Sequence, residues 1–195
     1  MKLKKSVKTS IAIIVIITLS LLIGFIYQML GNVFDRNSHP RPEEFTGFVS
    51  KYSAEYGVPE YIIYAVILEE SNFASNKLSE DGRIGLMQIS PDVFKKLTSM
   101  QRETLDAGML YDPETNIRYG AYYLSYLYTT YNRWNTVYAA YHMGTDAIDV
   151  WMREKEYTDE LGNLKSFPEL DTQKYVERIN HNSDMYRKLY YSGQK

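Results

Sequence analysis

A long apolar run near the N-terminus is the strongest pattern in the chain. The segment Ile11–Leu30 is interrupted only by small or mildly polar residues. About 20 helical residues span roughly 30 Å, which is the thickness of the hydrocarbon core of a bilayer. The run therefore predicts a single transmembrane helix over residues 11–30.

The charge beside this run predicts its orientation. It is preceded by Lys2, Lys4, Lys5 and Lys8. Because basic flanks stay in the cytoplasm, residues 1–10 are predicted to be a cytoplasmic flank, with everything after the run on the extracytoplasmic face. A cleaved signal peptide, which would leave a secreted protein, is the alternative. The length of the run and the lack of a clear small-x-small cleavage site favour an uncleaved, single-pass anchor in the cell membrane.

The pattern becomes helical after a short polar stretch. Residues 31–42 hold Gly, Asn, Ser and two prolines without apolar periodicity, and we interpret them as a linker. Apolar residues at helical spacing then predict a helix from Glu43 to near Gly57. Pro59 can open the next helix, whose apolar stripe runs up to Glu70 and Ser71.

Two cap-and-proline pairs mark further helices beyond a polar loop at residues 72–83. Ser90-Pro91 and Asp112-Pro113 each combine a capping side chain with a proline suited to the first turn. The helix after Asp112 carries a stripe of isoleucine and tyrosine, which is more typical of a core than of a binding surface. Another helix is predicted over Trp134–Met143, ending at Gly144.

The last part of the chain combines an excursion with a final helix. The charged segment 153–170 contains glycine and proline and is interpreted as exposed. Asp171 or Thr172 is predicted to cap a helix that extends to about Tyr190. We find no run of alternating strands and no internal repeat. The predicted fold class is mostly α: a compact helical domain over residues 43–191, with at most a small hairpin in a loop, behind one transmembrane helix.

Composition excludes several kinds of chemistry. The chain has no cysteine, which excludes disulfides and thiolate metal sites, and its three histidines are scattered without metal-ligand spacing. The four lysines before the apolar run leave 18 basic against 24 acidic side chains in the remainder, a net charge of −6. A nucleic-acid partner is therefore not expected, because its binders usually carry a basic surface.

Glu70 is a candidate acid because it ends an apolar helix where the chain turns polar. Partial desolvation there would raise its pKa and keep it protonated, as a general acid requires. Taken alone this is weak evidence, since a glutamate in the last turn of a helix is usually just a solvated charge. The motifs that follow change the interpretation. They are Gly85-Leu86-Met87-Gln88-Ile89, Asp112-Pro113 with Asn116-Ile117 and Gly120, Ala140-Tyr141-His142-Met143-Gly144, and Thr172 with Tyr175-Val176.

Five pieces in this order, beginning with Glu70-Ser71, resemble the soluble lytic transglycosylase family, which has a goose-lysozyme-like fold. The resemblance covers most of the chain from Glu43 to Tyr190. It implies a helical lysozyme-like domain that acts on peptidoglycan glycan strands without metal or cofactor. The bond cut would be the β-1,4 link between N-acetylmuramic acid and N-acetylglucosamine. It indicates no particular protein partner.

The resemblance also implies roles for single residues. Glu70 matches the catalytic acid/base, whereas Glu69 does not and is expected to be exposed. The remaining matches are substrate-side positions: the hydroxyl of Ser71, Gln88 lining the groove with Met87 packed beneath it, Tyr141, and Tyr175 with its hydroxyl near the catalytic carboxyl. One position departs from the family, because His142 stands where asparagine is usual. Imidazole can also donate and accept hydrogen bonds, so His142 stays a candidate for substrate orientation.

The implied mechanism uses one carboxyl group twice, first to protonate the bridging oxygen and then to accept the C6 hydroxyl proton as a 1,6-anhydro ring closes. Two alternatives remain open. Glu80 or Asp81 could hold a water opposite Glu70 for hydrolysis, although solvated loop charges are the commoner case. Because of His142, a non-catalytic glycan-binding relative is the other alternative.

Overall fold

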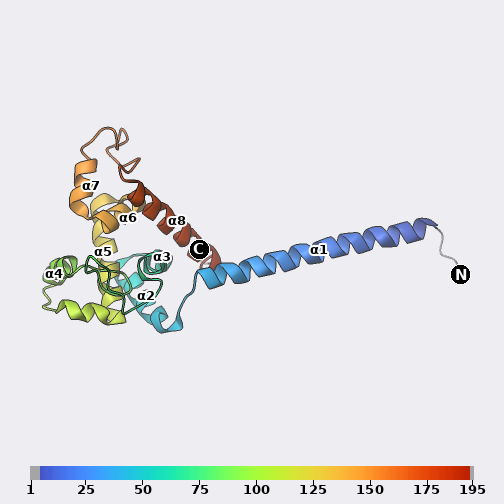
Figure 1. The fold of residues 1–195 in the computed structure, drawn as a ribbon, viewed down its shortest axis with the longest axis horizontal. Helices are drawn as coiled ribbons and strands as arrows, with labels where there is room; N and C mark the ends of the chain where they lie inside the picture. The colour runs from blue at the N-terminus through green and yellow to red at the C-terminus, as the bar shows by residue number, and fades with distance from the viewer. Residues whose placement is uncertain (1–4, 194–195) are drawn as a thin grey trace. The chain divides into compact units, whose positions relative to one another are not determined.

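The chain divides into two compact units, Met1–Pro40 and Arg41–Lys195. The computed structural model describes residues 5–193, with side chains described for residues 13–31 and 33–193. The first unit contains α1 (Lys5–Ser38). The second begins close to the expected Glu43 and contains all the other described helices (Figure 1). These are α2 (Glu43–Tyr56), α3 (Glu60–Ser71), α4 (Pro91–Met100), the 3-10 helix η1 (Ala107–Tyr111), α5 (Pro113–Tyr131), α6 (Trp134–Met143), α7 (Thr145–Trp151) and α8 (Leu170–Tyr190).

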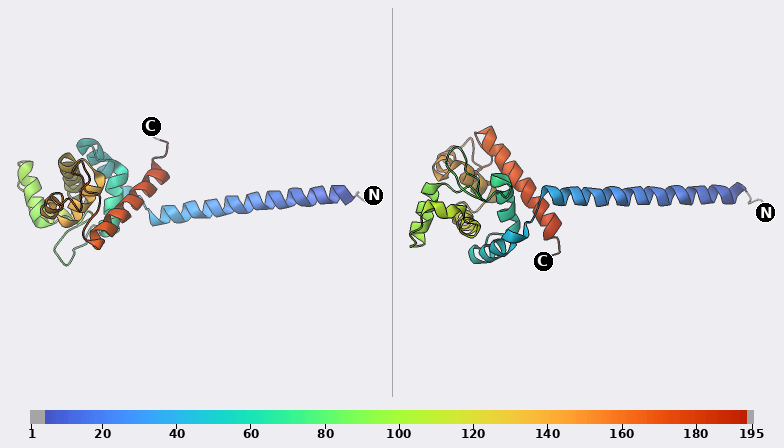
Figure 2. Two further views of the ribbon diagram at one scale, coloured as in Figure 1. Left: turned by 90° about the horizontal axis from the view of Figure 1, so that it is seen from above. Right: turned by 60° about the horizontal axis from the view of Figure 1, so that its bottom comes forward.

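Helix α1 is a single unbroken helix of 34 residues (Figure 2). The hydroxyls of Thr18 and Ser20 donate to carbonyls one turn back, so these polar interruptions are satisfied inside the helix. From Ile13 onward α1 is long enough and apolar enough to cross a membrane. A signal sequence would meet the same two criteria. Of the flanking lysines, Lys2 and Lys4 lie outside the described residues.

The expected linker at residues 31–42 is wrong over most of its length, because α1 continues to Ser38. Val33 and Phe34 extend the apolar character of the helix, and no proline interrupts the backbone before Pro40. A residue that precedes proline disfavours the helical conformation, which explains the end of α1 just before His39. The irregular stretch is therefore only a few residues long.

Helices α2 and α3 follow their predicted limits and form one side of the core. Gly57, at φ 69°, ends α2 with a left-handed turn, as expected for a helix stop. Helix α3 is buried on almost every side, so it carries isoleucine and valine around its circumference rather than in one stripe. Burial of these side chains outweighs the modest helix propensity of β-branched residues. Helix α8 packs along α3, and α5 along α2.

The two cap-and-proline predictions are confirmed. Ser90 accepts a hydrogen bond from the Val93 amide, and Asp112 accepts one from the Thr115 amide. In both cases the residue after the cap is a proline. The stripe on α5 is mainly core, as predicted. Tyr119 and Tyr123 are buried, whereas the other tyrosines of that stripe are only partly buried.

The predicted start of the last helix is wrong. Helix α8 begins at Leu170, and neither Asp171 nor Thr172 caps it. Thr172 is fully buried in the first turn, and its hydroxyl has no hydrogen-bond partner within the described part of the chain. Packing against the rest of the domain, rather than side-chain type, fixes this end. Helices η1 and α7 were not predicted, because each is too short to show a periodic pattern.

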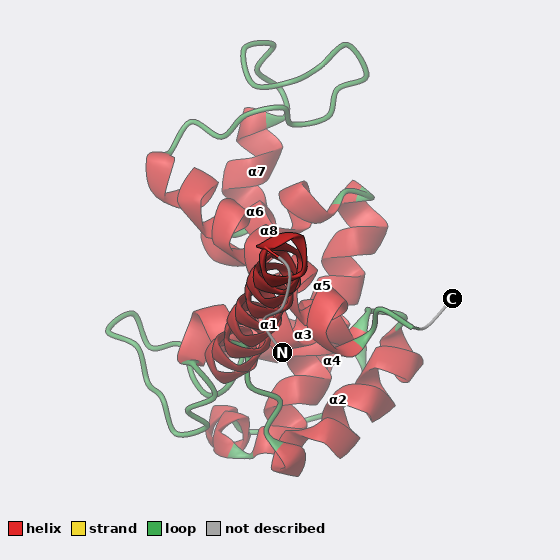
Figure 3. Cartoon of the chain, turned by 90° about the vertical axis from the view of Figure 1, so that its right-hand side faces the viewer, coloured by secondary structure: helices red, strands yellow, loops and turns green. Residues whose placement is uncertain are grey.

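The segment between α7 and α8 is a largely exposed excursion, as expected (Figure 3). It contains one small antiparallel bridge, Thr158 with Leu164. Its Asp159 side chain accepts from the amides of Leu161 and Asn163, which gives the turn its shape.

Asn116 fixes the sharp turn that follows the polar loop. Its side chain is fully buried on α5; it accepts from the Met87 amide at 2.7 Å and donates to the carbonyls of Ile84 at 2.9 Å and Leu110 at 2.8 Å. Gly85, at φ 81°, lies against it, and a Cβ there would collide with the Asn116 side chain and the Leu110 carbonyl. Only glycine therefore fits this position.

Arg41, the first residue of the second unit, contacts both α3, near the beginning of the unit, and the end of α8, its last helix. Its guanidinium lies 5.1 Å from the ring centre of Tyr64 on α3 and 5.3 Å from those of Tyr190 and Tyr191, at the end of α8. It also lies 3.7 Å from the Glu60 carboxylate, which accepts a hydrogen bond from the Tyr191 hydroxyl. One cation thus connects the first residue of the unit with the first turn of α3 and the last turn of α8.

We expect Asn116→Ala to lower the free energy of unfolding by about 3 kcal/mol or more, because one buried amide and two carbonyls lose their partner. Chemical denaturation of the full chain in detergent measures this loss. The matched control, Asn76→Ala, removes an exposed side chain and should change stability by less than about 0.5 kcal/mol. Equal effects of the two substitutions would contradict the assigned role of Asn116.

Candidate active site

Glu70 is a buried acid at the end of α3. Its side chain is 8% exposed, although it stands one residue from the end of the helix. Asn72, at φ 50°, ends α3 in a left-handed turn, and Lys77 donates from its ammonium group to the Glu70 carbonyl. The loop after α3 therefore folds back onto the end of the helix that carries this acid.

Tyr175 is the hydrogen-bond partner of this acid. Its hydroxyl donates to Glu70 Oε1 at 2.6 Å, across 105 residues of sequence, from the second turn of α8. No described residue bonds to Glu70 Oε2, so this oxygen is the one free to hold a proton or meet a ligand. Burial raises the pKa of Glu70, while the Tyr175 hydrogen bond and then the charge of Arg83 oppose that rise. The net effect keeps the proton on Glu70 to higher pH than on an ordinary glutamate.

The turn at residues 84–90 supplies a second wall. The backbones of Ile84 and Ile89 bond to each other in both directions, at 3.0 and 3.1 Å. Gln88 sits at φ 49° within this turn, and its side-chain amide donates to the carbonyls of Gly85 and Lys77. It thereby ties the turn to the loop that follows α3.

Tyr141 and His142 come from the end of α6. The Tyr141 hydroxyl donates to the Met87 carbonyl at 2.7 Å, which joins α6 to the turn. The His142 ring stacks on that of Tyr175, with centroids 4.4 Å apart and planes 19° from parallel. Burial, followed by the charge of Arg83, lowers the pKa of His142, so the neutral form is favoured.

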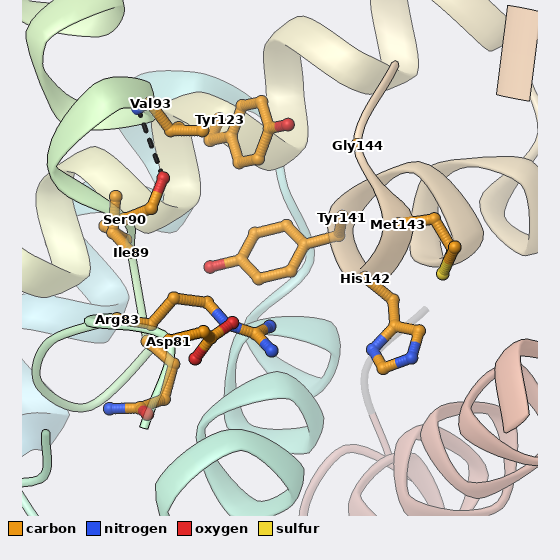
Figure 4. Close-up of a pocket in the computed structure, with 11 residues that line it drawn as sticks. Asp81, Arg83, Ile89, Ser90, Val93, Tyr123, Tyr141, His142, Met143 and Gly144 are labelled. Carbon is orange, nitrogen blue, oxygen red and sulfur yellow. Dashed lines mark hydrogen bonds and ion pairs between the residues drawn. The ribbon is translucent and has the colours of Figure 1, made fainter. Parts of the chain in front are cut away.

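These elements enclose a pocket of about 200 Å³ (Figure 4). It lies beside Glu70 rather than around it: His142 lines the pocket and stacks on Tyr175, which in turn holds the acid. The residues that line it are Asp81, Arg83, Gln88, Ile89, Ser90, Val93, Tyr123, Tyr141, His142, Met143 and Gly144. Within residues 5–193, no cluster of His, Asp or Glu could hold a metal ion.

The structure brings together most of the site residues expected from the sequence. Glu70 and Tyr175 form the buried pair, and Gln88, Tyr141 and His142 line the pocket next to it.

Two other expected site residues, Met87 and Ser71, do not line the pocket. Met87 is fully buried and packs over Gly120, where a Cβ would collide with its sulfur. It supports the turn from below, as its expected packing role requires. The Ser71 hydroxyl donates to the Ile67 carbonyl of its own helix at 3.1 Å. Neither side chain contacts the pocket.

Two acidic residues lie next to the site, and one of them differs from expectation. Glu69 was expected to be exposed, but only 16% of its side chain is. Its Oε1 pairs with Nε of Arg178 on α8 at 2.6 Å. Asp81 does line the pocket, but it is paired with Arg83 and bonded to Ser79. The Ser79 hydrogen bond, more than the charge of Arg83, lowers the pKa of Asp81, which makes it a weak base.

Two cations at the site, Lys77 and Arg83, were missed by the sequence analysis. Both lie in the polar loop that also holds Glu80 and Asp81, and this loop has no periodic pattern that would indicate where its side chains point. The signal that was present is a pair of basic residues within fifteen positions of a candidate buried acid.

Comparison with known proteins identifies the family to which the chain is similar. The profile of the transglycosylase SLT domain family matches residues 47–161. The soluble lytic murein transglycosylase of Escherichia coli (strain K12) is 28% identical over 171 residues, which cover 85% of this chain and 26% of that protein. The membrane-bound lytic murein transglycosylase C of Cronobacter sakazakii is 27% identical over 188 residues, which cover 84% of this chain and 52% of that protein. The chain thus spans between a quarter and about half of these relatives.

Solved structures give the same result. The 70 kDa soluble lytic transglycosylase of Escherichia coli superposes with a TM-score of 0.72 at 27% identity, covering 83% of this chain and 26% of that one. A complex of the 70 kDa soluble lytic transglycosylase with bulgecin A gives 0.69 at 28% identity, covering 79% and 25%. The expected mostly helical, lysozyme-like fold is confirmed.

We expect Glu70→Gln to stabilise the folded protein at neutral pH. The folded pKa lies above the unfolded value of 4.5, so the stability of the wild type falls as pH rises through the folded pKa. The glutamine variant has no proton to lose, and its advantage in Tm should grow above about pH 4.5 and vanish below it. Thermal unfolding of both proteins over a pH series measures the gap.

The control variant, Glu103→Gln, should change the stability in the opposite direction. The Arg118 hydrogen bond lowers the pKa of Glu103, so Glu103→Gln should cost stability at neutral pH, with the gap closing as pH falls through the folded pKa. If Glu70→Gln behaved like Glu103→Gln, the raised pKa of Glu70 would be wrong.

Proposed function

Because the chain belongs to the transglycosylase SLT domain family, we propose that it is a lytic transglycosylase of peptidoglycan. The substrate bond is the β-1,4 link between N-acetylmuramic acid and N-acetylglucosamine, and the product carries a 1,6-anhydro-muramyl end. The observation that supports this most is Glu70, an acid 8% exposed whose Oε1 is bonded to Tyr175. A neutral carboxylic acid beside a pocket is what protonation of a glycosidic oxygen needs.

In the proposed reaction Glu70 serves first as acid and then as base. Its Oε2 proton passes to the bridging oxygen as the bond from that oxygen to C1 of the muramyl residue breaks. The substrate's own acetamido group stabilises the cationic centre. The C6 hydroxyl of the same muramyl residue then adds to C1, and the Glu70 carboxylate accepts its proton. No water is consumed, and Glu70 ends in its starting form.

Tyr175 has a supporting role in this cycle. Its hydroxyl stabilises the carboxylate that exists between the two proton transfers, while burial favours the neutral acid at the start and end. The two effects oppose each other, which keeps both forms of Glu70 accessible. His142 holds the Tyr175 ring by stacking on it.

A hydrolase of the same bond is the alternative, and it needs a second carboxylate to activate water. Asp81 is the only acidic residue among those lining the pocket. Its hydrogen bonds to Ser79 and Arg83 oppose such a role, because they stabilise the charged form and weaken the base. The geometry therefore favours the lytic reaction.

We expect Glu70→Gln to lower cell-wall digestion by at least about 100-fold, the usual contribution of a general acid. A zymogram with purified walls measures this, and the raised Tm of the same variant shows that it is folded. Asp81→Asn serves as the matched control for hydrolysis and should leave the product unchanged. Digestion of the wall by Glu70→Gln at the native rate would overturn the assignment, and a wild type that binds walls without digesting them would favour a non-catalytic relative.

The products test the choice between the two reactions. Mass spectrometry of a digest should show muramyl ends one water lighter than reducing ends, because the C6 hydroxyl takes the place of water. Only hydrated, reducing ends would establish hydrolysis instead.

We also propose that α1 anchors the enzyme in the cell membrane, with the helical domain on the extracytoplasmic face. The support is the apolar part of α1, which could cross a membrane from Ile13 onward, and the similarity to a membrane-bound relative. The protein should remain with membranes in alkaline carbonate and keep its original N-terminus, because about 20 apolar residues suffice to span the bilayer. N-terminal sequencing checks this; a mature chain beginning after the apolar run would show that it is a signal peptide.

A further inference from the structure

Arg83 offers two unused donors in the pocket. Its Nε donates to Asp81 Oδ2 at 2.8 Å, and neither Nη group bonds to any residue among those described. Figure 4 shows the guanidinium directed beneath the Tyr141 ring toward His142. The edge formed by Nη1 and Nη2 therefore faces the pocket rather than the loop.

The surroundings of this guanidinium suit an anion. The Arg83 side chain is 28% exposed, whereas its partner Asp81 is 59% exposed, so the cation is the more buried member of the pair. The positive charge of Arg83 lowers the pKa of both Glu70 and His142, so it acts on groups on either side of the Tyr175 ring's hydrogen bond and stacking contact. Residues after the apolar run carry a net charge of −6, so a positive pocket wall is a local feature and not part of a general basic surface.

We propose that Arg83 forms a carboxylate subsite that recognises the acidic group carried by a muramyl residue. The inference rests on the proposed function. A guanidinium edge with two parallel N–H donors matches a carboxylate in bidentate geometry. N-acetylmuramic acid differs from N-acetylglucosamine by a lactyl ether, and this ether ends in a free carboxylate or continues into a peptide that itself carries carboxylates. Arg83 thus distinguishes a muramyl glycan from a neutral chain of N-acetylglucosamine.

Two other roles for Arg83 give different results in a binding experiment. A residue that only shapes the loop through Asp81 would affect charged and neutral glycans alike. A residue that only adjusts the protonation of Glu70 would lose its effect on binding once position 70 is glutamine. The test therefore uses Glu70→Gln as the reference protein, in which no glycan is cleaved and no charge remains at position 70.

The experiment measures the affinity of the full chain in detergent by calorimetry, at neutral pH and low salt. The four probes are the neutral tetramer of N-acetylglucosamine, a tetrasaccharide of two N-acetylglucosaminyl-N-acetylmuramic acid units with free lactyl carboxylates, the same tetrasaccharide with these groups converted to N-methylamides, and the same tetrasaccharide with stem peptides. Arg83→Gln and Arg83→Lys are each added to the reference. Arg187→Gln is the matched control, because that arginine also pairs with an exposed aspartate close in sequence.

We expect the reference to bind a carboxylate-bearing tetrasaccharide roughly ten-fold more tightly than the methylamide, the effect of one charge-assisted hydrogen-bonded pair. Arg83→Gln should remove this preference, Arg83→Lys should keep part of it, and Arg187→Gln should keep all of it. A preference for the free lactyl form identifies that carboxylate as the ligand, and a preference confined to the peptide-bearing form identifies the stem.

The subsite is overturned if Arg83→Gln keeps the preference for carboxylate, or if it weakens the methylamide as much as the charged forms. Binding of all four probes with equal affinity by the reference also overturns it, and leaves the proposed function in place. Absence of binding to every probe would instead refute the proposed function, and the subsite with it.

Discussion

A carboxylic acid withdrawn from water, with one phenol as its partner, is the interaction around which this domain is arranged. Burial of Glu70 is costly as soon as the group ionises, and a single hydroxyl from Tyr175 offsets part of that cost. The two residues are 105 positions apart, so the end of α3 and the start of α8 must be held in fixed register. The long contact between α3 and α8 provides that register. A small shift of either helix would leave the acid without its partner.

The turn at residues 84–90, which forms the second wall of the site, is held by the side-chain amide of Asn116. Asn116 reaches from α5 and satisfies backbone groups on both the turn at residues 84–87 and η1, and Gly85 permits the close approach that these bonds need. The Tyr141 hydroxyl then connects α6 to the same turn through the Met87 carbonyl. Helices α5 and α6 thus position a turn whose own residues have no regular structure. The loop that lines the pocket is thus bonded to helices at several points.

Local signals in the sequence were sufficient where short-range chemistry decides the structure. Ser90 and Asp112 cap their helices as their type and the following proline predict, since a cap needs only the next few amides. The start of α8 was misplaced because Thr172 has the side chain of a cap, yet tertiary packing buries it. Glu70 was a candidate from its place at the end of an apolar helix, and its expected catalytic role, like that of Tyr175, came with the family resemblance. Arg83 was missed because an aperiodic loop gives no indication of where a side chain points.

The contacts of Arg41, at the beginning of the second unit, have a mechanical consequence. Any tension that reaches the domain through Pro40 arrives at Arg41, which contacts Glu60 and Tyr64 in the first half of α3 and two tyrosine rings at the end of α8. Glu60 and Glu70 lie at opposite ends of a 12-residue helix, a separation of about 15 Å at 1.5 Å per residue. Pulling therefore loads the end of the helix remote from the acid. Under the proposed anchoring, a pull on the chain before Arg41 would therefore act away from Glu70, the residue proposed to react.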